Sequence, residues 1–281
     1  MNKETIIVSF SGGRTSGYMC YMLQTYLSHI YDFKYCFMNT GQEHEKTLEF
    51  VNNVDKYFNL NLVWLEARVQ KGRTGTKHEV VSYHTANRDG KYFEEVLAKF
   101  GLPDMNHIHC TREMKLRPIQ HWKKVNGYKD NREALGIRYD EFRRVKNDKG
   151  YIFPLATIFK TNKQEVLEFW SNQPFNLDIP EHLGNCVWCY KKSDKKLRMV
   201  ADDMPEAFDF PRILESKYSM IKNTSEANIE PRMIFRHNRC VDDIFNNTGL
   251  PYDISKLSDI SDCGEECGVI TASELERKMN E

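Results

Sequence analysis

The stretch Thr5-Ile-Ile-Val-Ser-Phe-Ser-Gly-Gly-Arg-Thr-Ser-Gly17 decides which fold the chain is expected to adopt. A short, β-branched apolar run ends in a Ser/Gly cluster, and a segment with helical apolar spacing begins near Tyr18. This order predicts a strand, a tight loop and the N-terminus of a helix. Glycines let the backbone come close to a ligand, and the start of a helix offers unpaired N–H groups to an anion. The stretch therefore predicts a phosphate-binding loop.

Downstream of this loop, strand-like and helix-like patterns alternate. Apolar runs at residues 33–38 and 60–65 predict strands, and the segments at 18–27 and 48–58 have helical spacing. Further strands are expected at residues 133–137 and 151–155. Such alternation predicts an α/β fold with a twisted, mostly parallel sheet of about five strands and helices on both faces.

Three regions depart from this alternation. Residues 66–106 are loop-like apart from a helix at 91–100, and a helix that begins at Thr111 is expected to be interrupted at Pro118. After a capping box at residues 161–164 the strand pattern ends and helical segments follow. We therefore expect a nucleotide-binding domain at residues 1–160 and a helical, cysteine-bearing C-terminal extension at residues 161–281.

The composition excludes some classes of function. The chain has 281 residues, and its 40 Lys and Arg balance 40 Asp and Glu, so no net charge attracts nucleic acid or an anionic membrane. No apolar run is long enough to span a bilayer, and no signal peptide is recognisable, so we expect no membrane partner. Eight cysteines in such a chain indicate a cytoplasmic protein whose thiols serve metal or thiol chemistry.

The loop at residues 11–16 lacks the Walker A spacing but resembles the S-G-G-x-x-S loop of the PP-loop superfamily, whose fold is HUP-like and Rossmann-like. Phe37-Met-Asn-Thr-Gly-Gln-Glu43 and Gly136-Ile-Arg-Tyr-Asp-Glu-Phe-Arg-Arg144 resemble segments of its phosphoadenosine phosphosulfate (PAPS) reductase-like family. The resemblance implies an adenine-nucleotide site formed by Ser9, Ser11, Gly12, Gly13, Arg14, Thr15, Ser16, Asn39, Thr40, Gly41, Glu43, Gly136 and Arg138.

Several of these charged residues have an ordinary structural alternative. Glu43 suits a sugar hydroxyl or a metal, but also a solvated first helical turn favoured by the helix dipole. Arg138 suits an oxyanion, but also an exposed charged turn. Lys115, in a segment that resembles the C-T-x-x-x-K-x-x-P motif of the same family, is a candidate catalytic cation or a surface lysine.

A cysteine constellation lies outside the nucleotide motifs. Cys186 and Cys189 form a C-x-x-C loop, which directs two thiolates at one ion. With Cys110 and Cys267 they would complete a four-cysteine set, although Cys240 or Cys263 could be the fourth ligand. The resemblance favours a [4Fe–4S] cluster over Zn²⁺, and spacing alone does not decide between them. Two other interpretations of the C-x-x-C loop remain: it is redox-active, or its two cysteines are reduced thiols that bind no metal.

The leading interpretation is an enzyme that cleaves ATP to AMP and pyrophosphate, with Mg²⁺, to activate an acceptor, and that transfers sulfur with the help of the cluster. Its catalytic candidates are Arg14, Lys115 and Arg138. The acceptor is a small molecule or a nucleic acid, and the sulfur comes from a separate donor.

Two alternatives remain open. One is a PAPS or APS (adenosine phosphosulfate) reductase that uses Cys267 with a thioredoxin-like reductant, although the family's E-C-G-x-H segment lacks its histidine here, where Ile270 stands. The other is a regulator that binds nucleotide or nucleic acid around a structural metal, since Arg14 and Thr15 stand where many ATP pyrophosphatases carry Lys-Asp. A basic cluster at residues 191–198 suits a nucleic-acid backbone, but more often is a solvated helix face.

Overall fold

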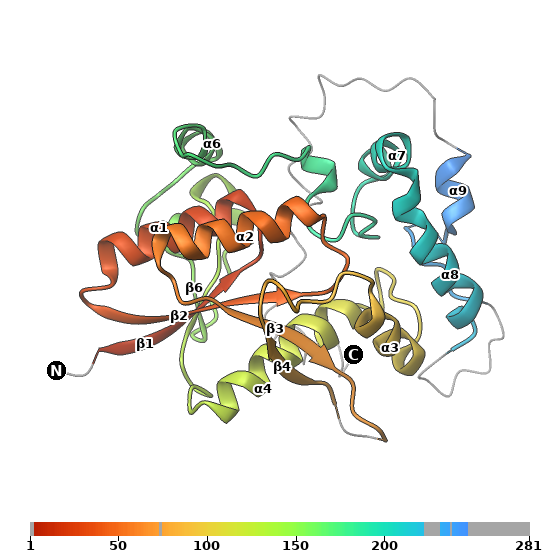
Figure 1. The fold of residues 1–281 in the computed structure, drawn as a ribbon, viewed down its shortest axis with the longest axis horizontal. Helices are drawn as coiled ribbons and strands as arrows, with labels where there is room; N and C mark the ends of the chain where they lie inside the picture. The colour runs from red at the N-terminus through yellow and green to blue at the C-terminus, as the bar shows by residue number, and fades with distance from the viewer. Residues whose placement is uncertain (1–2, 73–74, 222–230, 237, 247–281) are drawn as a thin grey trace.

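The computed structural model describes residues 3–72, 75–221, 231–236 and 238–246. Its centre is a six-stranded sheet in the order β4-β3-β2-β1-β5-β6 (Figure 1), in which every neighbouring pair is parallel except the antiparallel pair β3 and β4. The strands are β1 (Glu4–Phe10), β2 (Tyr31–Asn39), β3 (Val63–Arg68), β4 (Lys77–Val81), β5 (Glu133–Ala134) and β6 (Tyr151–Ile152). The predicted α/β class with a mostly parallel sheet is confirmed.

Helices cover both faces of the sheet, as the alternation predicts. In Figure 1, α1 and α2 lie on one face and α4 lies on the other. The α-helices are α1 (Arg14–Leu27), α2 (Glu45–Phe58), α3 (Lys91–Phe100), α4 (Arg117–Val125), α5 (Pro154–Thr157), α6 (Lys163–Ser171), α7 (Asp194–Asp203), α8 (Asp209–Tyr218) and α9 (Val241–Phe245). Short helical turns are η1 (Cys110–Leu116), η2 (Tyr139–Arg144), η3 (Glu181–Leu183) and η4 (Pro205–Phe208). Across the described residues, no helix is both long and apolar enough to cross a bilayer.

The two faces of β1 carry different cores because side chains alternate along a strand. Ile6 and Val8 are buried in the large core that α1 and α2 cover. Ile7 points the other way, into a smaller core with Cys36 of β2 and Trp122 of α4. Cys36 in this smaller core and Cys20 in the large core are therefore both core residues, as their apolar surroundings in the sequence indicate.

Two features of the fold, the strand β4 and the helix around Pro118, differ from the prediction. β4 lies in the region expected to be loop-like, and it pairs with β3 along five residues at the edge of the sheet. The predicted interruption of the helix at Pro118 is wrong. The π-helix η1 continues directly into α4, and Pro118 is the second residue of α4. Proline has no backbone N–H to donate, and the turn that precedes Pro118 is π-helical rather than α-helical, so the helix continues although its hydrogen bonding changes there.

The helical part of the chain after residue 160 shares the main core. Trp170 of α6 is fully buried, packs edge-on against Phe50 of α2, and donates its indole N–H to the carbonyl of Arg14 at 2.8 Å. Leu197 and Val200 of α7 belong to the same core as Val8 of β1. The division into domains at residues 1–160 and 161–281 stays a prediction.

Trp170 provides a test of how strongly α6 holds the start of α1. We expect Trp170→Ala to lower the free energy of unfolding by about 3–5 kcal/mol, because it leaves a cavity and removes a buried hydrogen bond. Denaturant unfolding followed by circular dichroism measures this change. Glu168→Ala, at an exposed position of the same helix, is the control and should change stability by less than about 0.5 kcal/mol. Equal stability of the two variants would contradict this packing.

Candidate functional site

The loop between β1 and α1 is shaped by Gly12. Its φ of 85° lies in the left-handed region, and a Cβ at this position would lie 2.8 Å from Cγ2 of Thr47. Gly13 precedes the first residue of α1 and provides no side-chain cap. The first N–H groups of this 14-residue helix therefore face the loop without a competing side chain, which is the arrangement that binds an anion.

Ser16 holds the loop in this shape from inside. Its hydroxyl accepts a hydrogen bond from the N–H of Ser11 at 3.1 Å, lies 2.8 Å from the hydroxyl of Ser11, and is 3.0 Å from the carbonyl of Gly13. Ser16 is 4% exposed. The two serines of the motif thus bind each other, and the backbone between them is fixed before any ligand arrives.

The end of β5 closes against this loop. A Cβ on Gly136 would lie 3.1 Å from Cα of Ser16, so any side chain here would press against the backbone of Ser16. Two residues further, Arg138 donates from Nη1 to the hydroxyl of Thr15 at 3.0 Å and forms an ion pair with Asp140 at 2.9 Å. Arg138 is only 2% exposed. It is a buried cross-link between the segment that follows β5 and the first turn of α1, rather than an exposed charged turn.

A cavity of about 380 Å³ opens above this junction. It is lined by Ser9, all of residues 11–16, Gly136 and Arg138, so the structure brings most of the predicted nucleotide-binding residues together. Five cationic side chains contribute to its walls: Arg14, Lys115, Arg138, Arg144 and Lys163. A loop of backbone N–H groups beside several cations suits a polyanionic ligand.

Arg14 reaches away from the loop toward the segment that follows α6. Its guanidinium donates to Oδ1 of Asn176 at 2.9 Å and to the carbonyl of Leu177. Burial lowers the pKa of Arg14, and the nearby carboxylates of Asp178 and Glu181 oppose the shift. Arg14 therefore anchors the segment at residues 176–177 against the start of α1.

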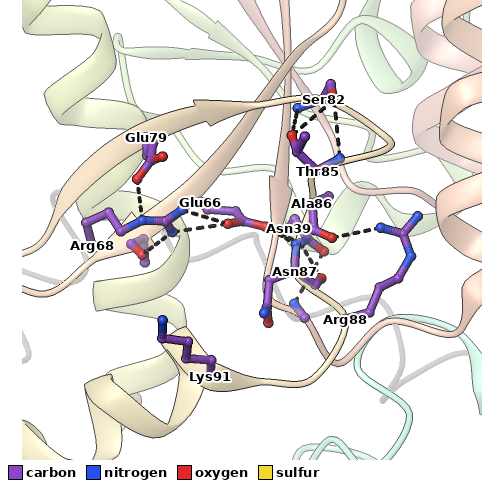
Figure 2. A network of polar contacts seen from close by, with 12 residues as sticks. Asn39, Glu66, Arg68, Glu79, Ser82, Thr85, Ala86, Asn87, Arg88 and Lys91 are labelled. Atoms are coloured by element: carbon purple, nitrogen blue, oxygen red, sulfur yellow. Dashed lines mark hydrogen bonds and ion pairs between the residues drawn. The ribbon is translucent and has the colours of Figure 1, made fainter.

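The predicted residues at the end of β2 take a different place. Asn39 is 1% exposed, and its amide nitrogen donates to Glu66 at 2.7 Å and to the carbonyl of Asn87 at 2.8 Å. Figure 2 shows this network, in which Glu66 also forms an ion pair with Arg68 at 3.1 Å. Asn39 thus ties the loop around Asn87 to the sheet. In the described part of the chain, the cavity lining does not include Asn39, Thr40, Gly41 or Glu43, and their contact with a nucleotide stays a prediction.

Thr40 and Glu43 instead meet the C-x-x-C loop. The hydroxyl of Thr40 donates to Glu43 at 2.7 Å and lies 3.2 Å from Sγ of Cys186. Glu43 and Cys186 form an antiparallel bridge. The indole N–H of Trp188 donates to the side chain of Gln42 at 2.6 Å, and Trp188 is buried, as expected for a residue that shields this loop from solvent.

The predicted metal ligands are placed only in part. Cys186 and Cys189 pack together, and both are buried. Cys110 lies at the start of η1, 3.7 Å from the hydroxyl of Tyr190, while Cys267 and Cys263 lie outside the described residues. Within residues 3–72, 75–221, 231–236 and 238–246, no three His, Cys, Asp or Glu side chains are grouped so that they could hold a metal ion.

The comparisons with known proteins agree with the motifs. Residues 5–152 match the phosphoadenosine phosphosulfate reductase domain. The chain is 35% identical over 202 residues to the uncharacterized nin region protein ORF290 of Escherichia phage lambda, and the alignment covers 70% of this chain and 69% of that protein. The chain belongs to the phosphoadenosine phosphosulfate reductase domain family.

Two further proteins are more distantly similar. An uncharacterized protein of Methanocaldococcus jannaschii is 28% identical over 225 residues, which cover 74% of this chain and 47% of that protein. The crystal structure of a PAPS reductase from Candida auris, in a phosphate complex, has a TM-score of 0.39 and 16% identity, over 61% of this chain and 74% of that chain.

The basic cluster after the C-x-x-C differs from its prediction in this member of the family. The prediction of a solvated helix face is wrong for three of its lysines. Lys191, Lys192 and Lys196 are 5%, 0% and 2% exposed. Lys192 donates to the carbonyls of His182 and Val187, and Lys196 forms an ion pair with Glu181 at 2.8 Å. These ammonium groups hold the C-x-x-C loop to the chain before it.

Glu133 also lines the cavity, although it is not among the predicted site residues. Glu133 of β5 is 7% exposed and accepts a hydrogen bond from the hydroxyl of Ser9 at 2.5 Å. A carboxyl group inside a segment expected to be a buried strand was the available signal, because buried charges are rare without a partner or a function.

The role of Lys192 is testable. We expect Lys192→Met to lower the free energy of unfolding by about 1–3 kcal/mol, because two buried carbonyls lose their donor. Chemical denaturation measures the loss, and the fluorescence of Trp188, isolated from the other three tryptophans by subtracting the spectrum of Trp188→Phe, reports on the loop itself. Lys129→Met, at an exposed position, should leave both readouts unchanged. A fully stable Lys192→Met variant with an unchanged Trp188 signal would show that this ammonium does not hold the loop.

Proposed function

We propose that this member of the family is an enzyme that binds ATP and cleaves its α–β linkage, transferring AMP to an acceptor and releasing pyrophosphate. The observation that supports this proposal is the cavity, in which a pre-shaped loop at the start of α1 lies beside several cations. Its volume of about 380 Å³ is in the range of small-molecule sites. Binding a triphosphate requires both hydrogen-bond donors, which the backbone N–H groups provide, and positive charge, which the cations provide.

In the proposed reaction, a nucleophilic atom of the acceptor bonds to the α-phosphorus while the bond to the bridging oxygen breaks. Pyrophosphate leaves with the electron pair of that bond. The N–H groups at residues 12–16 stabilise the charge that develops on it, and Lys115 adds a cation from η1. Arg138 and Arg14 have side-chain partners in the protein, so we assign them to positioning the loop through Thr15 and the segment at 176–177. Mg²⁺ that arrives with the nucleotide would neutralise part of the phosphate charge.

Lys115 is the sharpest test of this mechanism. We expect Lys115→Met to lower kcat for pyrophosphate release from ATP by about 100-fold, because a cation near the leaving group is lost. A coupled pyrophosphate assay measures the rate across a panel of acceptors. Lys91→Met, at an exposed position at the start of α3, is the control and should retain the wild-type rate. Binding of ATP without pyrophosphate release under any condition would instead support a non-catalytic, nucleotide-binding regulator.

The family name supports a second candidate, which is a PAPS or APS reductase. In that reaction the thiolate of Cys267 attacks sulfur, the bond from sulfur to the phosphate oxygen breaks, and a thioredoxin-like dithiol reduces the resulting thiosulfonate to release sulfite. Cys267 lies outside the described residues. Thioredoxin-dependent sulfite release that is lost in Cys267→Ser, with no pyrophosphate release from ATP, would favour this candidate.

The cysteines carry a separate proposal, which is that Cys110, Cys186, Cys189 and Cys267 bind a [4Fe–4S] cluster that assists sulfur transfer. The described residues on their own do not form such a site, so no step of the reaction above passes through it. Support comes from the C-x-x-C loop and from its position against the loop that follows β2.

Metal content decides this proposal. Protein purified anaerobically should contain iron and absorb visible light, and Cys186→Ser should lose both, because a thiolate ligand is removed. Cys20→Ala is the control, since Cys20 lies in α1 within the large core rather than in the C-x-x-C loop, and should retain the iron. A colourless, zinc-loaded protein would exclude the iron–sulfur cluster.

A further inference from the structure

Glu133 is a buried carboxyl group that opens on the cavity. It lies on β5, in register with Ile7 of β1, and therefore on the same face of the sheet as Ser9 and Cys36. The hydroxyl of Ser9 donates to its Oε1 at 2.5 Å. The function proposed above uses the phosphate loop and the cations, and it leaves this carboxyl group without a role.

The walls around Glu133 are apolar. Cys36 and Met38 of β2 line the cavity from the sheet, and Leu116 and Ile119 line it from η1 and α4. Ile119 and Cys36 belong to the small core between the sheet and α4. This part of the cavity is thus lined by apolar side chains from the sheet and from η1 and α4, with a carboxyl group among them, a lining that suits a heterocycle with a polar edge.

We propose that Glu133, in its neutral form, recognises the edge of adenine that carries N1 and the 6-amino group; this inference rests on the proposed binding of ATP. A neutral carboxyl group has one O–H donor and one carbonyl acceptor side by side. Adenine presents the complementary pair, because N1 accepts a hydrogen bond and the 6-amino group donates one. An ionised carboxylate has no donor, and its lone pairs would face the lone pair of N1.

The surroundings of Glu133 favour the neutral form. Burial raises the pKa of Glu133, and the hydrogen bond from Ser9 and the positive charge of Lys123 on α4 oppose the shift. Cys36 on β2 is a second titratable group close to it, and the pKa of Cys36 is raised by burial and by Glu133. Because the pKa is raised, the neutral form persists to higher pH than in an exposed glutamate, and it is lost as the pH rises through the raised value.

The test is the pH dependence of adenine-nucleotide binding. The probe is α,β-methylene-ATP, whose α–β linkage cannot be cleaved, and its Kd is measured by calorimetry from about pH 5, just above the ordinary pKa of a glutamate, to about pH 9. We expect wild-type affinity to fall about tenfold as Glu133 ionises, which is the scale of one hydrogen bond to the base. Glu133→Gln keeps one donor and one acceptor at every pH, so its affinity should not fall in this way.

A matched control separates Glu133 from other titrations, including that of the probe. Burial raises the pKa of Glu215 on α8 to about 7, and Glu215 lies outside the cavity lining in the described part of the chain. Glu215→Gln should therefore keep the wild-type pH profile. A second measurement needs no variant: the 1-deaza analogue of the probe lacks the N1 acceptor and should bind the wild type about tenfold more weakly at the acidic end of the range.

The outcomes separate this inference from the proposed function. If the probe binds neither the wild type nor Glu133→Gln at any pH, the adenine-nucleotide function itself is wrong. If the probe binds and the pH profiles of the wild type and Glu133→Gln coincide, recognition by Glu133 is overturned while nucleotide binding stands. Equal affinity of the wild type for the probe and its 1-deaza analogue overturns it in the same way.

Discussion

The close approach of β5 to the start of α1 is the constraint on which the site depends. Gly136 lies so near Ser16 that a methyl group would meet its Cα at 3.1 Å, and Arg138 then reaches Thr15 across the same gap. β1 and β5 are neighbours in a parallel sheet, so their carboxyl ends must meet at one edge. The loop is held from both sides, which lets its N–H groups converge on a ligand without paying an ordering cost at binding.

The parts of the fold that the sequence predicted are those that carry their own pattern. β1 and β2 are buried on both faces and appear as continuous apolar runs, while α1 and α2 show helical spacing. β4 was missed because Lys77-His-Glu-Val-Val81 has no such pattern. It is an edge strand whose residues are mostly exposed, and its existence depends on pairing with β3. A strand that is stabilised mainly by pairing with its neighbour need not show a strand pattern in its own sequence.

The same distinction holds for the site. Residues 11–16 and Arg138 were predictable because the chemistry lies in short contiguous motifs. Asn39 follows a strand in the way a ligand-binding residue does, but its amide is used by Glu66 and Asn87, which the sequence does not place beside it. Glu133 was not predicted because its place beside Ser9 depends on the register of β5 with β1, which its own segment does not reveal. Lys192 looked like a surface charge because the two carbonyls that it binds belong to a fold that spacing alone does not reveal.

One segment connects the phosphate loop with the cysteines. Arg14 anchors it at residues 176–177, and Gly184 and Asn185 line the cavity. The next residue, Cys186, forms the bridge with Glu43. Asn185 adopts a φ of 57°, a conformation that few side chains tolerate, so the chain turns sharply between the cavity wall and the thiol. The cavity wall and the C-x-x-C loop are therefore joined by consecutive residues, and the thiol of Cys186 belongs to the residue that directly follows the cavity lining.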